Sequence, residues 1–265
     1  MELTRTQVEA ILASIQDRYL GQDLITAKMV KELTVAGDQV TLKLVQGYPA
    51  GAYKAELQAE ITDKLKQAGV RVAQVQIDTV INAHAVQKSV KRHDGIKNII
   101  AVASGKGGVG KSTTAVNVAL ALLADGAKVG ILDADIYGPS QPRMLGISGQ
   151  PLSEDGRTLR PMQNHGLKAM SIGFLIEEDT PMIWRGPMVT QALEQLLNDT
   201  QWGDLDYLVV DLPPGTGDIQ LTLSQKIPVS GAIIVTTPQD IALLDARKGL
   251  KMFEKVEVPI LGVVE

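Results

Sequence analysis

The most informative segment of this chain is Gly105–Thr113, which has the sequence GKGGVGKST. It satisfies the pattern G-x-x-x-x-G-K-[ST], in which glycines let successive backbone N–H groups face the oxygens of a phosphate. The apolar run Ile99–Ala103 precedes it and predicts a buried strand. A helix is predicted after it from apolar residues at helical spacing: Ala115, Val118, Ala119 and Leu122. Strand, glycine loop and helix in this order predict a phosphate-binding loop.

Within this loop, two residues have side chains suited to a magnesium-bound nucleoside triphosphate. The pattern places Lys111 against the β- and γ-phosphates and the Ser112 hydroxyl on magnesium. The helix that begins near Lys111 adds the positive end of its dipole. Lys106 is an additional lysine of the loop, which either contacts phosphate in its own subunit, reaches a facing subunit, or is simply exposed.

Carboxylates follow two further apolar runs. Asp133 and Asp135 come after Val129–Leu132, and Asp211 comes after Tyr207–Val210. Ligands of open α/β sheets bind at the carboxyl ends of the strands, so these residues are expected beside the glycine loop. A carboxylate at the position of Asp211 typically holds magnesium, here through a water molecule. The alternative is that these aspartates only cap helices.

The second part of the chain alternates apolar runs with helical patterns. Its strands are predicted at Ile99–Ala103, Val129–Leu132, Tyr207–Val210, Ala232–Val235 and Ile260–Val264. Such alternation indicates a mostly parallel sheet flanked by helices, the α/β class of P-loop NTPases. A hairpin is expected on one edge of the sheet, within residues 152–184.

The first part of the chain has a different pattern, typical of a small α+β domain. Thr6–Glu9 has the form of a helix capping box. Val40–Leu44 alternates apolar and polar residues as a half-buried strand does, with Glu32–Val35 as its hairpin partner. A helix carrying Leu57, Ile61 and Leu65 and a strand over Val70–Ile77 complete it. We therefore expect a domain at residues 1–82, a solvated linker at 83–97 and the P-loop domain at 98–265.

Composition excludes several classes of function. The 265 residues carry a formal net charge of −4, which predicts no overall electrostatic footprint for nucleic acid. There is no apolar run of membrane-spanning length and no signal-peptide pattern, so a cytoplasmic protein is expected. The count of cysteine is zero, which excludes disulfides and thiolate ligands among these residues.

The motifs together resemble one known family. A lysine in the second position of GKGGVGKST is similar to the deviant Walker A loop of the MinD/ParA/Mrp class of ATPases. Three further motifs resemble its Mrp/ApbC branch, which comprises ATP-dependent iron–sulfur cluster carriers: DADIYGPSQPRMLG at Asp133–Gly146, WRGPM at Trp184–Met188 and DLPPGTGD at Asp211–Asp218. The first domain resembles the small MIP-type domain that precedes many bacterial Mrp proteins.

The resemblance implies roles for particular residues. Lys106, Lys111 and Asp135 are implied to be catalytic: Lys106 reaches nucleotide across a homodimer interface, and Asp135 orients the attacking water. Ser112 and Asp211 are implied to hold magnesium, Asp211 also beginning the second switch loop, while Asp133 organises its own loop. The nucleotide-binding set is Gly105, Lys106, Gly107, Gly108, Val109, Gly110, Lys111, Ser112, Thr113 and, near the adenine within Thr237–Gln239, Pro238.

The chain also departs from the family pattern. Mrp carriers have a C-x-x-C motif after a Gly-Val-Val-Glu-Asn stretch, and these cysteines hold a [4Fe–4S] cluster between subunits. This chain ends at Gly262–Glu265 and has no cysteine. It therefore resembles a truncated carrier, with no iron–sulfur ligand in these residues. Loss of the elements after the final strand is expected to expose part of a sheet face and to reduce solubility.

These expectations combine into one predicted function and two alternatives. The chain is predicted to bind and hydrolyse ATP as a nucleotide-switched homodimer that carries iron–sulfur clusters to apo-proteins or assembly factors. One alternative is a partition-type or positioning ATPase that acts on DNA or a membrane, although no basic helix or amphipathic tail is visible. The other is a non-catalytic, nucleotide-gated interaction module.

Overall fold

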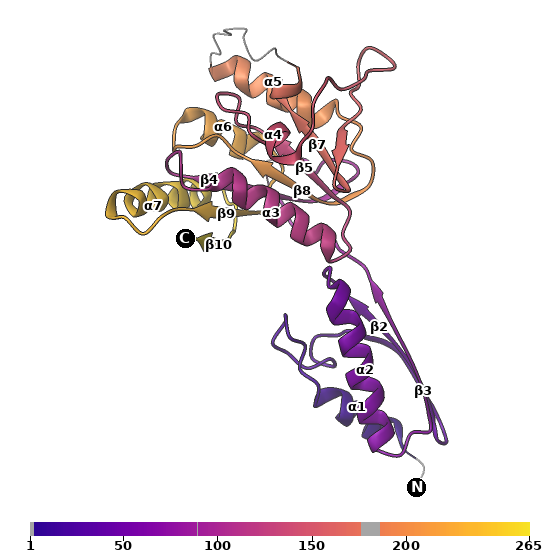
Figure 1. Ribbon diagram of the computed structural model, residues 1–265. Helices are drawn as coiled ribbons and strands as arrows, with labels where there is room; N and C mark the ends of the chain where they lie inside the picture. Colours follow the sequence, from indigo (N-terminus) through magenta and orange to yellow (C-terminus); the bar gives the residue numbers. More distant parts are fainter. Residues whose placement is uncertain (1–2, 89, 176–185) are drawn as a thin grey trace. The chain divides into compact units, whose positions relative to one another are not determined.

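The computed structural model describes residues 3–88, 90–175 and 186–265 (Figure 1). Trp184 and Arg185 of the WRGPM motif lie outside the described residues. The chain divides into two compact units, residues 1–82 and 83–265. Each unit is described by itself below.

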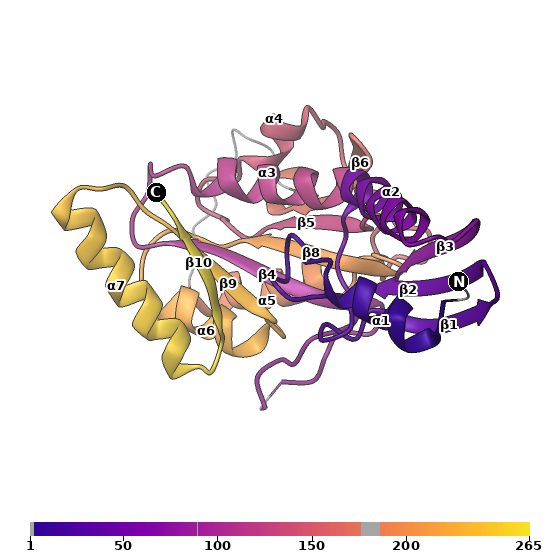
Figure 2. The same cartoon turned by 90° about the horizontal axis from the view of Figure 1, so that it is seen from below.

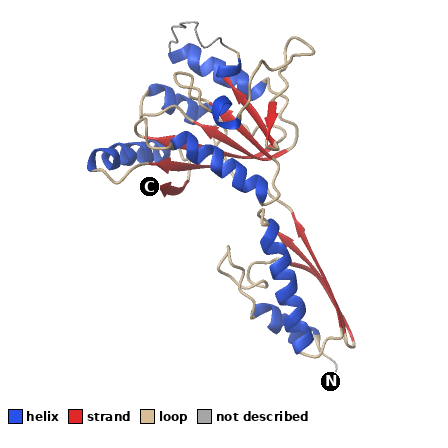
Figure 3. Cartoon of the chain, in the orientation of Figure 1, coloured by secondary structure: helices blue, strands red, loops and turns tan. Residues whose placement is uncertain are grey.

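The first unit is a three-stranded sheet with two helices (Figure 3). β2 is the central strand; it pairs antiparallel with β1 and parallel with β3, and α2 connects β2 to β3. Leu57, Ile61 and Leu65 of α2 are fully buried, as their helical spacing predicts. The elements are α1 Arg5–Ala13, β1 Val30–Ala36, β2 Gln39–Gln46, α2 Gly51–Gln67 and β3 Val72–Thr79.

The capping box of the first helix lies two residues before the predicted position. The N-cap is Thr4, whose hydroxyl accepts a hydrogen bond from the backbone N–H of Gln7, while the Gln7 amide oxygen accepts one from the Thr4 N–H. The prediction of a box at Thr6–Glu9 is therefore wrong. A glutamine in the third helical position closes a capping box as a glutamate does. Thr4 with Gln7 and Thr6 with Glu9 therefore both fit the pattern, and the structure uses the first pair.

The second unit is a seven-stranded sheet in the order β10-β9-β4-β8-β5-β7-β6. All neighbouring strands are parallel except β6 and β7, which form the hairpin expected within residues 152–184. The mostly parallel α/β sheet predicted from the sequence is confirmed. Its elements are β4 Ile96–Ser104, α3 Lys111–Ala124, β5 Val129–Asp133, α4 Gln141–Leu145, β6 Met162–Asn164, β7 Leu167–Ser171, the 3-10 helix Ile172–Phe174, α5 Gly186–Asn198, β8 Leu205–Asp211, α6 Asp218–Lys226, β9 Gly231–Val235, α7 Asp240–Lys255 and β10 Ile260–Val264.

The helices of this unit lie on both faces of the sheet. α3 packs on β4, β5 and β8, whereas α5 and α6 pack together on the opposite face (Figures 1 and 2). Because β4, β5, β8 and β9 are parallel, the loops that follow them leave the sheet at the same edge. This edge therefore brings together the glycine loop and the aspartates after β5 and β8.

The segment at residues 83–97 is not uniformly solvated, as a linker was expected to be. Gln87 is buried in the second unit, where its amide donates to the backbone oxygens of Ser224 and Ile227 and accepts from the N–H of Val229. The sequence did not predict this contact, because the lysines and the arginine near Gln87 indicate an exposed segment and no local pattern marks Gln87 as buried.

No helix in the described part of the chain is long and apolar enough to span a bilayer.

The core of the second unit has no room beside Gly130 in β5. A Cβ atom there would lie 2.8 Å from Leu205 Cδ1 and 3.1 Å from Trp202 Cζ3. We expect Gly130→Ala to lower the free energy of unfolding of this unit by about 1–3 kcal/mol through overpacking. Urea unfolding followed by tryptophan fluorescence measures it, since both tryptophans belong to residues 83–265.

The control is Gly262→Ala in β10, where an added Cβ meets no atom within 4 Å. It should change the unfolding midpoint little. Equal midpoints for the two variants would contradict the packing argument.

Candidate functional site

The loop between β4 and α3 has the backbone that a phosphate cradle requires. Gly108 and Gly110 have φ angles of 79° and 87°, in the left-handed region that side chains with a Cβ rarely adopt. A Cβ at either position, or at Gly107, would meet no atom within 4 Å, so no other element packs against the loop at these glycines. Gly110 caps α3 without a side-chain hydrogen bond, which leaves the N–H groups of the first turn available to an anion.

Gly105 has a different reason to be glycine. A Cβ atom on it would lie 2.5 Å from the carbonyl carbon of Asp245 in α7. The backbone of the loop is therefore packed directly against α7. This contact holds the start of the loop while its middle stays open.

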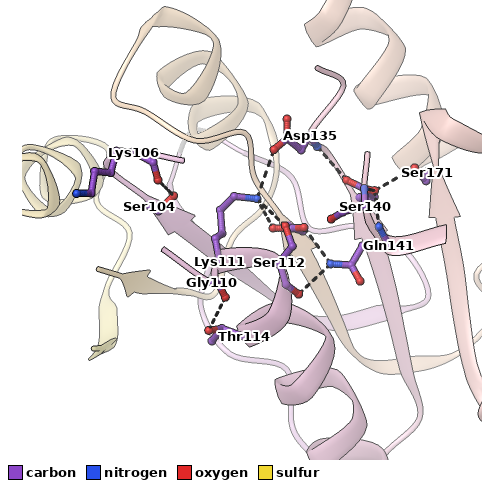
Figure 4. A network of polar contacts seen from close by, with 12 residues as sticks. Ser104, Lys106, Gly110, Lys111, Ser112, Thr114, Asp135, Ser140, Gln141 and Ser171 are labelled. Carbon is purple, nitrogen blue, oxygen red and sulfur yellow. Dashed lines mark hydrogen bonds and ion pairs between the residues drawn. The ribbon is translucent and has the colours of Figure 1, made fainter. Parts of the chain in front are cut away.

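Lys111, the first residue of α3, is the centre of the site (Figure 4). Its side chain is only 7 % exposed. Nζ donates to Asp211 Oδ1 at 2.5 Å and to the Ser112 hydroxyl at 3.2 Å, and it lies 3.7 Å from Asp135 Oδ2. The structure thus brings together four residues that the sequence predicted from three separate segments.

Asp133 organises the loop after β5, in agreement with the prediction. Its Oδ2 accepts hydrogen bonds from the N–H groups of Ser140 and Gln141 and from the Ser171 hydroxyl, and its Oδ1 accepts one from the N–H of Asp135. Burial and repulsion by Asp211 raise the pKa of Asp133 to about 7, against the effect of these hydrogen bonds. Asp133 is fully buried and its carboxylate accepts these four hydrogen bonds from the protein, as expected of a residue that holds the loop.

Asp135 lies in the loop after β5, with its carboxylate near the Lys111 ammonium. Burial raises the pKa of its carboxyl, Lys111 opposes this shift, and Asp211 adds to it. A carboxylate that is only 8 % exposed and lies beside the Lys111 ammonium is suited to accept a proton or a hydrogen bond from water.

Gln141, at the start of α4, is a member of the site that the sequence did not reveal. Its amide nitrogen donates to Asp211 Oδ2 at 2.9 Å and to the backbone oxygen of Ser112 at 3.1 Å. The only available signal was the Ser-Gln-Pro start of a short helix soon after Asp133. That signal predicts a helix start, and not which way the amide points.

Lys106 is not part of this network. Its backbone oxygen accepts a hydrogen bond from the Ser104 hydroxyl at 2.8 Å, while its side chain points away from Lys111 (Figure 4). Of the choices that the sequence left open, a contact with phosphate in its own subunit therefore fits this arrangement least.

The residues predicted near the adenine lie at the same edge of the sheet. Thr237 and Pro238 follow β9, the neighbour of β4, and Pro238 is exposed. Its position is compatible with a base but has no feature specific to one.

The few protein oxygens of the site suit magnesium, and not a metal ion that is held by protein ligands alone. No group of three or more His, Cys, Asp or Glu side chains that could hold a metal was found among the described residues. Magnesium keeps several waters and is held by one or two protein oxygens together with phosphates. The Ser112 hydroxyl and the Asp211 carboxylate, both within reach of the Lys111 ammonium, fit such an ion.

Fold and site together define a P-loop NTPase. The model of a family described as NUBPL iron-transfer P-loop NTPase matches residues 95–265, and that of an iron–sulfur cluster assembly protein family matches residues 5–77. The chain belongs to this family of iron–sulfur cluster carriers. The resemblance inferred from the motifs is thereby confirmed.

Relatives support the assignment along the whole chain. An iron–sulfur cluster carrier protein of Escherichia coli K12 is 52% identical over 100% of this chain and 72% of its own length, and one of Haemophilus influenzae is 54% identical over 98% and 71%. A nucleotide-binding protein of Archaeoglobus fulgidus, solved in complex with ADP, is 40% identical with a TM-score of 0.56, covering 65% of this chain and 67% of its own.

Removal of the Lys111 ammonium should destabilise the ligand-free protein. Lys111→Met leaves two carboxylates, Asp135 and Asp211, without their cation, and removing one partner of a buried ion pair costs about 3–5 kcal/mol. Asp211→Asn should cost less, because the ammonium keeps Asp135 and the serine hydroxyl. Urea unfolding without nucleotide should therefore give the highest free energy of unfolding for wild type, a lower one for Asp211→Asn and the lowest for Lys111→Met. A Lys111→Met protein as stable as wild type would contradict it.

Proposed function

We propose that this protein is a cytoplasmic carrier of iron–sulfur clusters that binds and hydrolyses ATP and works as a nucleotide-switched homodimer. Family membership supports the carrier role. The observation that supports the ATP-dependent step is the position of the Lys111 ammonium, between Asp135, Asp211 and Ser112 at the end of an open glycine loop.

In this proposal the triphosphate lies in the loop Gly105–Thr113. The open backbone from Gly107 to Gly110 and the N-terminus of α3 face the phosphates. Lys111 exchanges its bond to Asp211 for the β- and γ-phosphates, which releases Oδ1 of Asp211. Ser112 and Asp211 would hold magnesium, which would supply positive charge to the phosphate oxygens.

Asp135 is the residue proposed to orient the attacking water. Water forms a bond to the γ-phosphorus, the bond from that phosphorus to the bridging oxygen breaks, and ADP leaves with the electron pair. One proton of the water stays on the released phosphate and the other passes to solvent. The carboxylate of Asp135 lies 3.7 Å from the Lys111 ammonium, so it stands beside the position proposed for the γ-phosphate. The hydrogen bonds of the Asp135 carboxylate would then differ between the ATP-bound and ADP-bound states, as a switch requires.

Lys106 is proposed to act on the nucleotide of the other subunit. It belongs to the loop, yet its side chain points away from Lys111. We infer that an ammonium in this orientation binds the phosphate of a second copy whose loop faces the first. In this proposal the catalytic residues of each site are Lys111 and Asp135 of one subunit and Lys106 of the other subunit.

The cargo is proposed to be a [4Fe–4S] cluster passed to apo-proteins or taken from assembly factors. None of the 265 residues is a cysteine, so the thiolates that would hold a cluster are not among them. We also propose two domains, the first ending at residue 82. The second was expected to begin at residue 98, but β4 begins at Ile96 and Gln87 is bonded within the second unit, so we place its start earlier. The two family matches, at 5–77 and 95–265, support a division into two domains.

Nucleotide binding tests the first step. Wild type should bind a fluorescent ATP analogue with magnesium, and Lys111→Met should weaken binding about 10–100-fold, since it removes a charge-assisted bond to phosphate. Lys66→Met, which changes an exposed lysine at the end of α2, is the matched control and should bind as wild type does. Absence of binding by wild type, or equal binding by Lys111→Met, would refute the proposal.

Mixed dimers test the position of Lys106. Lys106→Ala and Asp135→Asn should each be inactive as ATPases alone. In a mixture, a heterodimer has one complete site, formed by Asp135 of the first variant and Lys106 of the second. An equimolar mixture should therefore recover about a quarter of wild-type activity if dimers exchange freely. No recovery, with heterodimers shown to form by differently tagged copies, would place Lys106 in its own subunit's site.

A further inference from the structure

We propose that Gln141 is a positioning residue for the magnesium site and that it holds Ser112 and Asp211 at a fixed separation. The inference rests on the proposed function, because magnesium enters with ATP. It goes further, in that it assigns a task to a residue which supplies no ligand itself.

The amide group of Gln141 connects the two residues proposed to hold the ion. Its single nitrogen, Nε2, donates both to the carboxylate of Asp211, at 2.9 Å, and to the backbone oxygen of Ser112, at 3.1 Å (Figure 4). Gln141 is 1 % exposed, so neither bond competes with water. α3 and the end of β8 are thus joined by one NH₂ group.

The orientation of this amide is determined by its neighbours. Both facing atoms, Asp211 Oδ2 and Ser112 O, are acceptors only, so a flipped amide would place Oε1 against two oxygens. Oε1 is buried and has no hydrogen-bond partner within the described parts of the chain. Leaving an acceptor unsatisfied costs free energy, which is consistent with a residue retained for the bonds of its nitrogen.

The backbone of Gln141 is held as firmly as its side chain. Its N–H donates to Asp133 Oδ2 at 3.0 Å, and the same oxygen accepts from the Ser140 N–H and the Ser171 hydroxyl. Asp133 and Asp211 are themselves paired in register on neighbouring strands. The amide therefore extends from a fixed point of the sheet edge.

The two oxygens of Asp211 have separate partners. Oδ1 accepts from Lys111 and Oδ2 accepts from Gln141. When Lys111 turns to the phosphates, Oδ1 becomes available to magnesium or its water. Gln141 keeps its bond to Oδ2 and prevents the carboxylate from rotating. Because the amide is neutral, it orients the carboxylate without reducing the charge that attracts the ion.

The test separates the affinity for magnesium from the affinity for nucleotide. Gln141→Met has a similar length and no donor. Binding of a non-hydrolysable ATP analogue is titrated with Mg²⁺ and also measured in EDTA. We expect the half-saturating Mg²⁺ concentration to rise about tenfold, equal to about 1.4 kcal/mol, while affinity in EDTA stays within about twofold of wild type.

Gln46→Met is the matched control, since Gln46 of β2 is also buried with an unpartnered Oε1. It should lower the melting temperature without shifting the Mg²⁺ midpoint, which shows what a purely structural loss does. Gln141→Asn keeps the amide but is too short to reach both acceptors; it should shift the midpoint too, and it carries the test if Gln141→Met does not fold.

An unchanged Mg²⁺ midpoint in a folded Gln141 variant would overturn the inference and leave the proposed function intact. Wild-type protein that binds no analogue at any Mg²⁺ concentration would instead overturn the proposed function, and this inference with it.

Discussion

The site depends on one buried charge, the ammonium of Lys111. It neutralises Asp211, which is fully buried, and lies close to Asp135. A buried carboxylate without a cation is costly, so this ion pair stabilises the site. In the function proposed above, the same ammonium would also bind the phosphates.

The geometry around that charge follows from a parallel sheet. Parallel strands present their carboxyl ends at one edge, and β4, β5, β8 and β9 do so in adjacent positions. The first residue of α3 supplies the lysine, while the loop after β5 and the last residue of β8 supply its carboxylates. Asp133 then contributes no ligand but holds the backbone from which Gln141 extends. The result is a site in which residues from α3, α4, the loop after β5 and the end of β8 are bonded to one another.

Much of this could be predicted from the sequence, for identifiable reasons. GKGGVGKST favours its own backbone, because residues other than glycine rarely adopt the φ angles found at Gly108 and Gly110. Apolar runs ending in aspartate place Asp133 and Asp211 correctly, because strand direction determines which end carries the ligand. Local patterns failed where two of them overlapped, as at the first helix, whose cap is Thr4. They also failed where a polar residue is buried by distant elements, as Gln87 is.

By itself the sequence determined the class of fold, the phosphate loop and the residue types of the site, since each is encoded in neighbouring residues. Only the tertiary structure decided that Lys111 pairs with Asp211, that Gln141 joins Asp211 to Ser112, and that Lys106 points away from both. These are contacts between segments up to 100 residues apart in the chain. Their geometry depends on the register of strands and the start of helices, and no local pattern of residues carries that information.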